Sequence, residues 1–169
     1  MPHILPYKDI YPTIDPTAYI ADNAVIIGDV HIGAESNVWF GCTIRGDVNH
    51  IRIGKRTNIQ DHTMIHVTRK TGPTIIGDNI TIGHSVLLHA CTLESESFIG
   101  MGSTIMDGAI VQSHAMLAAG AVLTPNKKIP AQQIWSGNPA RYMRDMRQEE
   151  LDFIAISAQN YVNLGKEYQ

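Results

Sequence analysis

Residues 14 to 44 read IDPTAYIADNAVIIGDVHIGAESNVWFGCTI, and every sixth residue of this stretch is aliphatic. These positions are Ile14, Ile20, Ile26, Ile32, Val38 and Ile44. A period of six would place successive apolar residues on opposite sides of an α-helix, which has 3.6 residues per turn, so the pattern excludes an amphipathic helix. Six residues suffice instead for one short strand and one corner.

The same period continues to residue 123 with interruptions. It breaks between Gly46 and Arg52 and between Val67 and Ile75, and it shifts by one residue before Leu93. The further aliphatic positions are Ile53, Ile59, Ile65, Ile76, Ile82, Leu88, Leu93, Ile99, Ile105, Val111, Leu117 and Leu123. Because one strand and corner cannot bury an apolar face alone, stacked coils must share these side chains as a core. At three positions per coil, the repeat predicts a parallel β-helix of about six coils over about residues 10 to 135.

The C-terminal part of the chain has a different period. Its apolar residues recur every three or four positions, at Leu151, Ile154, Ala158, Tyr161 and Leu164. This spacing predicts an α-helix over about residues 146 to 167 that packs along the β-helix. A chain of 169 residues is an ordinary size for one domain, so we expect a single domain over residues 1 to 169.

The composition argues against several classes of partner. The formal net charge is −3 and the Lys and Arg residues are scattered, so no basic surface for nucleic acid is expected. The sequence contains neither a signal peptide pattern nor an apolar run long enough to cross a membrane. We therefore expect a cytoplasmic protein without nucleic-acid or membrane partners, in which Cys42 and Cys91 are buried free thiols.

Three of the eight histidines fall in the middle coils of the repeat. His66 and His89 each follow an aliphatic position, and His84 lies five residues before His89. In a three-sided coil this spacing puts His84 and His89 on neighbouring faces, so they could bind one ion only if another subunit supplied part of the set. The spacing leaves two interpretations open, which are a metal site at an oligomer interface and surface histidines hydrogen-bonded to their neighbours.

The segments around these histidines resemble the gamma-class carbonic anhydrase family, whose fold is a left-handed parallel β-helix of hexapeptide repeats. The matching segments are Arg45-Gly46-Asp47, Asn58-Ile59-Gln60-Asp61 leading to His66, Ile82-Gly83-His84, and His89-Ala90-Cys91. The resemblance implies a homotrimer in which His66, His84 and His89 bind a metal ion, with two ligands from one subunit and one from the next. Zinc (Zn²⁺) is the expected metal, and Fe²⁺ and Co²⁺ are alternatives that imidazole ligands also suit.

The resemblance further implies reversible hydration of carbon dioxide, a small-molecule substrate, to bicarbonate by a metal-bound hydroxide. Zinc with three imidazole ligands and an open position brings the pKa of bound water to about 7. Gln60 would orient the hydroxide, and Asn58 would help to hold the substrate. Tyr161 lies where relatives have a tyrosine near the metal and is a candidate active-site hydroxyl, with core packing as the alternative.

Three charged residues of the matching segments have roles in the family. Arg45 and Asp61 resemble a pair that forms a salt bridge between subunits, and Asp47 belongs to the same polar cluster. A purely structural ion pair is an equal alternative to a catalytic role.

Two segments depart from the archaeal prototype of the family. Residues 48 to 50 follow Asp47 and residues 68 to 71 follow His66, and neither segment contains a glutamate, the residue that shuttles protons in the prototype. The resemblance is therefore to the subclass without the acidic loop, in which hydration activity is inconsistent. His50 and His62 are candidate substitutes because imidazole titrates near pH 6.5, with ordinary polar roles as the alternative.

Three other functions stay open. The same metal site could hydrolyse a thioester or another activated acyl group. Acyl transfer is suggested by the repeats and by Ser136-Gly137-Asn138-Pro139-Ala140, a segment shared across the superfamily, but acyltransferases do not need three histidines. The metal could also stabilise a non-catalytic trimer, in which case its removal would weaken assembly while no substrate turned over.

Overall fold

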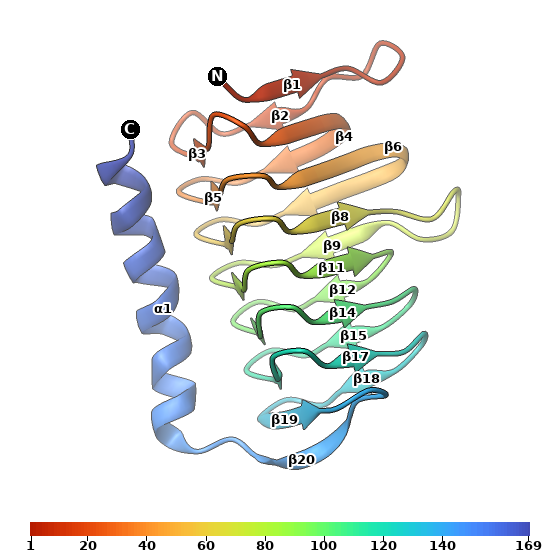
Figure 1. Ribbon diagram of the computed structural model, residues 1–169, viewed down its shortest axis with the longest axis vertical. Coiled ribbons are helices and arrows are strands. Elements are labelled where there is room, and N and C mark those ends of the chain that lie inside the picture. Colours follow the sequence, from red (N-terminus) through yellow and green to blue (C-terminus); the bar gives the residue numbers. More distant parts are fainter.

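A computed structural model of the protein describes residues 1 to 169. The chain winds into a three-sided stack of parallel strands, and one helix lies along one side of the stack (Figure 1). This is the left-handed parallel β-helix with a C-terminal helix that the sequence predicts.

Each face of the β-helix is a ladder of parallel strands. The first face contains β1 (His3–Leu5), the first parts of β4 (Val25–Ile32) and β6 (Thr43–Ile53), β8 (Met64–His66), β11 (Leu87–His89), β14 (Thr104–Ile105) and β17 (Val122–Leu123). The second face contains β2 (Thr13–Ile14), the second parts of β4 and β6, β9 (Thr74–Ile76), β12 (Thr92–Leu93), β15 (Ile110–Val111) and β18 (Lys128–Ile129). The third face contains β3 (Tyr19–Ile20), β5 (Asn37–Val38), β7 (Asn58–Ile59), β10 (Thr81–Ile82), β13 (Phe98–Ile99), β16 (Met116–Leu117) and β19 (Gln133–Ser136).

The β-helix has about seven turns, one more than the repeat predicts, and it extends beyond the expected residues 10 to 135 at its N-terminal end. Strand β1 forms part of the first turn, where Ile4 pairs with Ile26. The loop after β1 breaks the six-residue period, so Ile4 is out of phase with Ile14 in the sequence. At the other end, Trp135 pairs with Leu117 and occupies a position where the repeat expects an aliphatic residue.

The aliphatic positions of the repeat form the core. On the first face, Ile26, Ile44, Ile65, Leu88, Ile105 and Leu123 lie in register on successive turns, and all are fully buried. The two interruptions of the repeat both fall at the corner between the first and second faces. The strands on either side stay in register there, as Ile44 with Ile65 and Ile53 with Ile76 show. Extra residues therefore extend outward at this corner without disturbing the core.

The chain ends by turning back along the stack. Strand β20 (Arg141–Asp145) pairs antiparallel with β19, and the helix α1 (Gln148–Glu167) then runs along the third face (Figure 1). The carboxylate of Glu150 accepts hydrogen bonds from the Arg144 guanidinium at 2.6 and 2.8 Å and from the backbone N–H of Arg147 at 2.9 Å. These bonds fix the start of α1 to β20.

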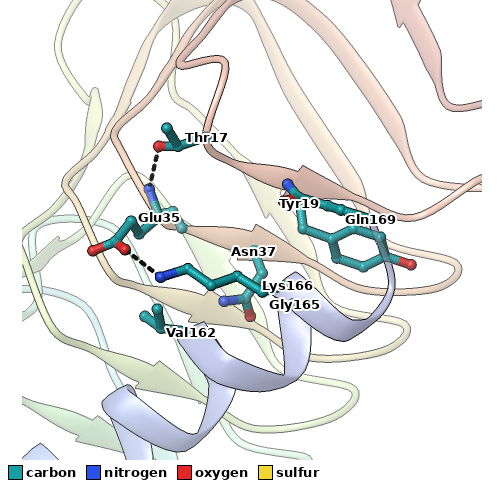
Figure 2. A pocket seen from close by; sticks show the side chains of 9 residues that line it. Thr17, Tyr19, Glu35, Asn37, Val162, Gly165, Lys166 and Gln169 are labelled. Carbon is teal, nitrogen blue, oxygen red and sulfur yellow. Dashed lines mark hydrogen bonds and ion pairs between the residues drawn. The ribbon is translucent and has the colours of Figure 1, made fainter.

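The buried side of α1 differs in part from the predicted stripe. Its buried residues are Ile154, Ser157, Ala158, Val162 and Gly165, whereas Leu164 faces outward and is exposed. Near the helix end, Lys166 Nζ forms an ion pair with Glu35 at 2.7 Å, and Glu35 N donates to Thr17 Oγ1 at 3.0 Å (Figure 2). The helix has no apolar stretch long enough to span a membrane.

Candidate metal centre

His66 and His89 come together at the corner between the first and second faces. They end β8 and β11, which are neighbouring strands, and the two residues are directly paired in the ladder. The distance between His66 Nδ1 and His89 Nε2 is 3.2 Å. The stacking of one turn on the next therefore brings two of the three predicted ligands into contact.

The second nitrogen of each ring is held by a carboxylate. Asp47 Oδ1 lies 3.0 Å from His66 Nε2, and Asp107 Oδ1 lies 2.7 Å from His89 Nδ1. Thr68 Oγ1 donates in turn to Asp107. A carboxylate behind a ligating imidazole orients the ring and fixes its tautomer. We call His66, His89, Asp47 and Asp107 the paired corner.

Asp107 and Thr68 were not predicted from the sequence. Asp107 lies 18 residues after His89, which is one coil of three six-residue repeats. A search of the next coil for a residue beneath each candidate ligand could have found it. Thr68 lies in an interruption of the repeat, where the period gives no position.

The charges of the paired corner are stabilised within the chain. Burial alone would raise the pKa of Asp47, but hydrogen bonds from His66 and Arg45 outweigh it and leave this pKa below its ordinary value. Burial likewise opposes ionisation of Asp107, and hydrogen bonds from Thr68 and His89 again leave its pKa lowered. Both carboxylates are therefore ionised at neutral pH.

The paired corner has a spacing suited to a tetrahedral metal ion. Two imidazole nitrogens, each about 2.0–2.1 Å from a tetrahedral zinc ion, lie about 3.3 Å apart. The 3.2 Å between His66 Nδ1 and His89 Nε2 is close to this separation. The chain alone, however, brings together no group of three or more His, Cys, Asp or Glu side chains that could hold a metal.

His84 lies at a different corner, between the third and first faces, in the turn after β10. Its Nδ1 is 2.9 Å from Asp61 Oδ2, and its side chain is 46% exposed. Asp61 and the adjacent Gln60 belong to the preceding turn, because β7 pairs with β10. We call His84, Asp61, Gln60 and Asn58 the single corner.

Gln60 and Asn58 are buried in the single corner. Gln60 Nε2 donates to Asn58 Oδ1 at 3.0 Å, and Asn58 Nδ2 donates to the carbonyl oxygen of Ile80 at 3.2 Å. Gln60 also lines a mostly apolar cavity of about 290 Å³, together with residues that include Met101 and Met116. The corner thus combines an oriented amide with an apolar space.

The charged pair predicted between Arg45 and Asp61 is not formed within the chain. Arg45 contacts Asp47, and Asp61 contacts His84. A salt bridge between subunits stays a prediction for these two residues.

Within the chain, Tyr161 packs against another aromatic side chain, which was the alternative to a role in the active site. Its ring packs edge-on against Trp39, with the ring centroids 5.8 Å apart. Burial, together with the charge of Asp61, raises the pKa of Tyr161.

The two candidate proton shuttles lie outside the paired corner's hydrogen bonds. His50 lines a cavity of about 240 Å³ together with Asp29 and with Asp47 of the paired corner. His62 is exposed at a turn, where it covers Gly41.

The sequence is similar to named carbonic anhydrases. It is 52% identical over 163 residues to gamma carbonic anhydrase 1, mitochondrial, of Arabidopsis thaliana, a match that covers 94% of the chain and 59% of the plant protein. It is 40% identical over 166 residues to the carbonic anhydrase of Geobacillus kaustophilus, covering 98% of the chain and 91% of that protein. The chain thus spans about three-fifths of the length of the plant relative. No family model matches the chain.

The structure is similar to a solved hexapeptide-repeat protein. A hexapeptide transferase family protein from Anaplasma phagocytophilum superposes with a TM-score of 0.96 at 46% identity, covering 99% of the chain and 98% of that protein. Sequence and structure therefore indicate one superfamily, and the named sequence relatives distinguish the family within it.

Proposed function

The chain belongs to the gamma carbonic anhydrase family, and we propose that it hydrates carbon dioxide reversibly to bicarbonate at a metal site shared between subunits of a homotrimer. The observation that supports this proposal most directly is the 3.2 Å separation of His66 Nδ1 and His89 Nε2, with a carboxylate behind each ring. His84 is exposed at another corner, so a second copy can bring its own His84 to this pair.

Cyclic symmetry accounts for the division of the ligands. In a trimer with three equivalent interfaces, each interface would join one paired corner to one single corner, which gives three sites. Met64 and Leu87 point outward beside His66 and His89 and are 42% and 41% exposed. Exposed apolar residues next to a candidate site favour its burial by another copy of the chain.

Neutral imidazole donors fit zinc, and also Fe²⁺ and Co²⁺. A divalent ion held by three imidazoles would supply Lewis-acid chemistry and a hydroxide at neutral pH. Asp47 and Asp107 would hold the rings of His66 and His89 in the required tautomer. These carboxylates would act through the ligands and would not contact carbon dioxide.

The single corner would orient the reactants. Gln60 Nε2 donates to Asn58, which leaves Gln60 Oε1 as an acceptor for the O–H of the attacking oxygen. An accepted hydrogen bond there would direct the oxygen lone pair toward the carbon of the substrate. Carbon dioxide is small and apolar, and the cavity beside Gln60 has a mostly apolar lining.

Complementation between two inactive variants tests this proposal. His84→Ala and His89→Ala chains should each be inactive alone. When they are denatured, mixed in equal amounts and refolded with zinc, about a quarter of the interfaces should join an intact paired corner to an intact single corner. Stopped-flow hydration should recover to about a quarter of the wild-type rate per chain.

Two controls make the result decisive. Each variant is refolded alone to give the background rate, and bound metal is measured in every sample. A mixture that stays inactive although it contains mixed trimers would contradict a site shared between subunits. A fully metallated wild-type trimer that does not hydrate carbon dioxide would contradict the proposed activity.

Hydrolysis of a thioester is a second candidate function. The apolar lining beside Gln60, which includes Met101 and Met116, could accept an acyl chain in place of carbon dioxide. The same metallated protein can be assayed with acyl thioesters of increasing chain length. Turnover that rises with chain length, in a protein inactive toward carbon dioxide, would favour this function.

The predicted cytoplasmic location stays a prediction. The name of the plant relative places that protein in mitochondria.

A further inference from the structure

The hydrogen bonds behind Gln60 continue beyond Asn58 into the C-terminal helix. Asn58 Nδ2 donates to Thr81 Oγ1 at 2.9 Å, and Thr81 Oγ1 lies 2.8 Å from Ser157 Oγ. The four side chains are between 0% and 6% exposed. A buried chain of hydrogen bonds therefore joins Gln60 on the third face to Ser157 on α1.

One group that contacts Asn58 can only accept a hydrogen bond. The carbonyl oxygen of Ile80 carries no proton, so the end of Asn58 beside it must be the NH₂ group. Asn58 Oδ1 then faces Gln60 and must accept, which requires Gln60 to donate through Nε2. The orientations of Asn58 and Gln60 thus leave Gln60 Oε1 available as an acceptor.

Thr81 and Ser157 complete the support of the Asn58 amide. The Thr81 oxygen accepts a proton of Asn58 Nδ2, so its own hydroxyl proton is available for Ser157 Oγ. The NH₂ group of Asn58 therefore has two acceptors, the Ile80 carbonyl and Thr81 Oγ1. Because these side chains are largely buried, the loss of one bond would leave a polar atom without its partner, which costs free energy.

The helix that carries Ser157 is fixed on both sides of this residue. Glu150 binds Arg144 before it, and Lys166 binds Glu35 after it. Ile154 and Ala158 are buried against the β-helix around it. Ser157 therefore has a defined position relative to Thr81.

We propose that Thr81 and Ser157 are positioning residues, through which α1 fixes the orientation of the Gln60 amide. Neither residue contacts the reacting atoms, and both act through Asn58. The proposal rests on the proposed function, in which Gln60 Oε1 accepts the hydrogen bond of the attacking oxygen. It gives the C-terminal helix a part in the reaction beyond covering the third face.

Three variants of the metallated trimer test the proposal. Thr81→Val keeps the shape of the side chain and removes the hydroxyl, whereas Thr81→Ser keeps the hydroxyl. Ser157→Ala removes the hydroxyl with which α1 contributes to the hydrogen bonds. Ser36→Ala is the matched control, because Ser36 is also buried and its hydroxyl donates to the carbonyl of Gly54, outside this chain of bonds.

Two measurements are made on each variant. The first is hydrogen exchange of the Gln60 side-chain amide by NMR, and the second is kcat and KM for hydration at known metal content. Thr81→Val should speed the exchange about tenfold and lower kcat about three- to tenfold, with KM and bound metal unchanged. Thr81→Ser should restore both values, and Ser157→Ala should add little in the Thr81→Val background.

The outcomes separate this proposal from the proposed function. If Thr81→Val and Ser157→Ala lower only the melting temperature, as Ser36→Ala should, the positioning role is wrong. If the wild-type protein does not hydrate carbon dioxide, the proposed function is wrong, and the exchange rates still decide whether Thr81 and Ser157 hold Gln60.

Discussion

The paired corner and the single corner are built by different means on the same chain. His66 and His89 meet because β8 and β11 are neighbouring strands, so the stacking of turns is enough to place them. Gln60 depends on Asn58, Thr81 and Ser157, and the last of these lies on a helix distant in the sequence. The comparison indicates that the stacking of turns can place two candidate ligands, whereas the proposed orientation of the Gln60 amide depends on packing between segments distant in the sequence.

The largest effect is expected for His84, the proposed metal ligand of the single corner. His84→Ala should lower hydration at least about a hundredfold, because only two imidazoles would remain for a metal that needs three. His114→Ala is the matched control, since the His114 side chain is 44% exposed, close to that of His84, and lies 3.1 Å from a carboxylate, that of Glu96. Stopped-flow rates and metal content compare the two variants. Equal activities would show that His84 is an ordinary surface histidine.

A smaller effect on metal affinity is expected for Asp107, the carboxylate that contacts His89. Asp107→Asn keeps the shape of the side chain but removes the charge behind His89. The affinity for zinc should fall roughly 10- to 100-fold, as is usual when such a partner is lost. Competition with a chelator measures the affinity, and Asp78→Asn, at another corner, is the control. An unchanged affinity would mean that stacking alone orients His89.

A pH experiment tests how firmly α1 is attached. Hydrogen bonds from Arg144, and then from the Arg147 backbone, hold the pKa of Glu150 well below its ordinary value of 4.5. Because the folded pKa is lowered, the stabilisation by Glu150 is present above pH 4.5 and is lost as the pH falls below this value. The melting temperature of the wild type should therefore fall more steeply below pH 4.5 than that of Glu150→Gln. Parallel curves would show that Glu150 does not anchor the helix.

The smallest effect concerns the thiols beside the two corners. Burial raises the pKa of Cys91, next to the paired corner, to about 12, and that of Cys42, which contacts the Gln60 carbonyl, to about 11. At pH 8 the thiolate would be about one part in a thousand or less, so iodoacetamide should label neither thiol in the folded protein. Mass spectrometry before and after metal removal checks this. Labelling of Cys91 alone after metal removal would show that the paired corner opens without its ion.

The sequence predicts the fold well where the six-residue period is unbroken. Ile14 to Ile44 alone indicate the stacked coils, and each of these positions faces the interior. The period could not identify the first turn, because the loop after β1 shifts Ile4 out of phase. The last turn keeps the six-residue step from Leu123 to Ile129 and Trp135, but Trp135 stands where the repeat expects an aliphatic residue.

The sequence predicts fewer contacts of the candidate site than of the core. The repeat places His66 and His89 each directly after an aliphatic position, but the interruption between Val67 and Ile75 leaves their register open. The pairing of β8 with β11 brings the two residues together. The contact of Ser157 with Thr81 could not be predicted, because the sequence does not set the rotation of α1 against the third face. The predicted stripe shows this, since it included the exposed Leu164 and omitted Ser157 and Gly165.

The antiparallel pairing of β20 with β19 has a consequence for solubility. A stack of parallel turns ends in unpaired backbone groups, and another chain could add to such an edge and extend it into a fibre. Here the chain itself occupies the edge beneath the third face, with Gln133 to Ser136 paired to Arg141 to Asp145. Because β20 runs antiparallel to β19, a further coil could not continue the parallel pairing of the third face directly below β19.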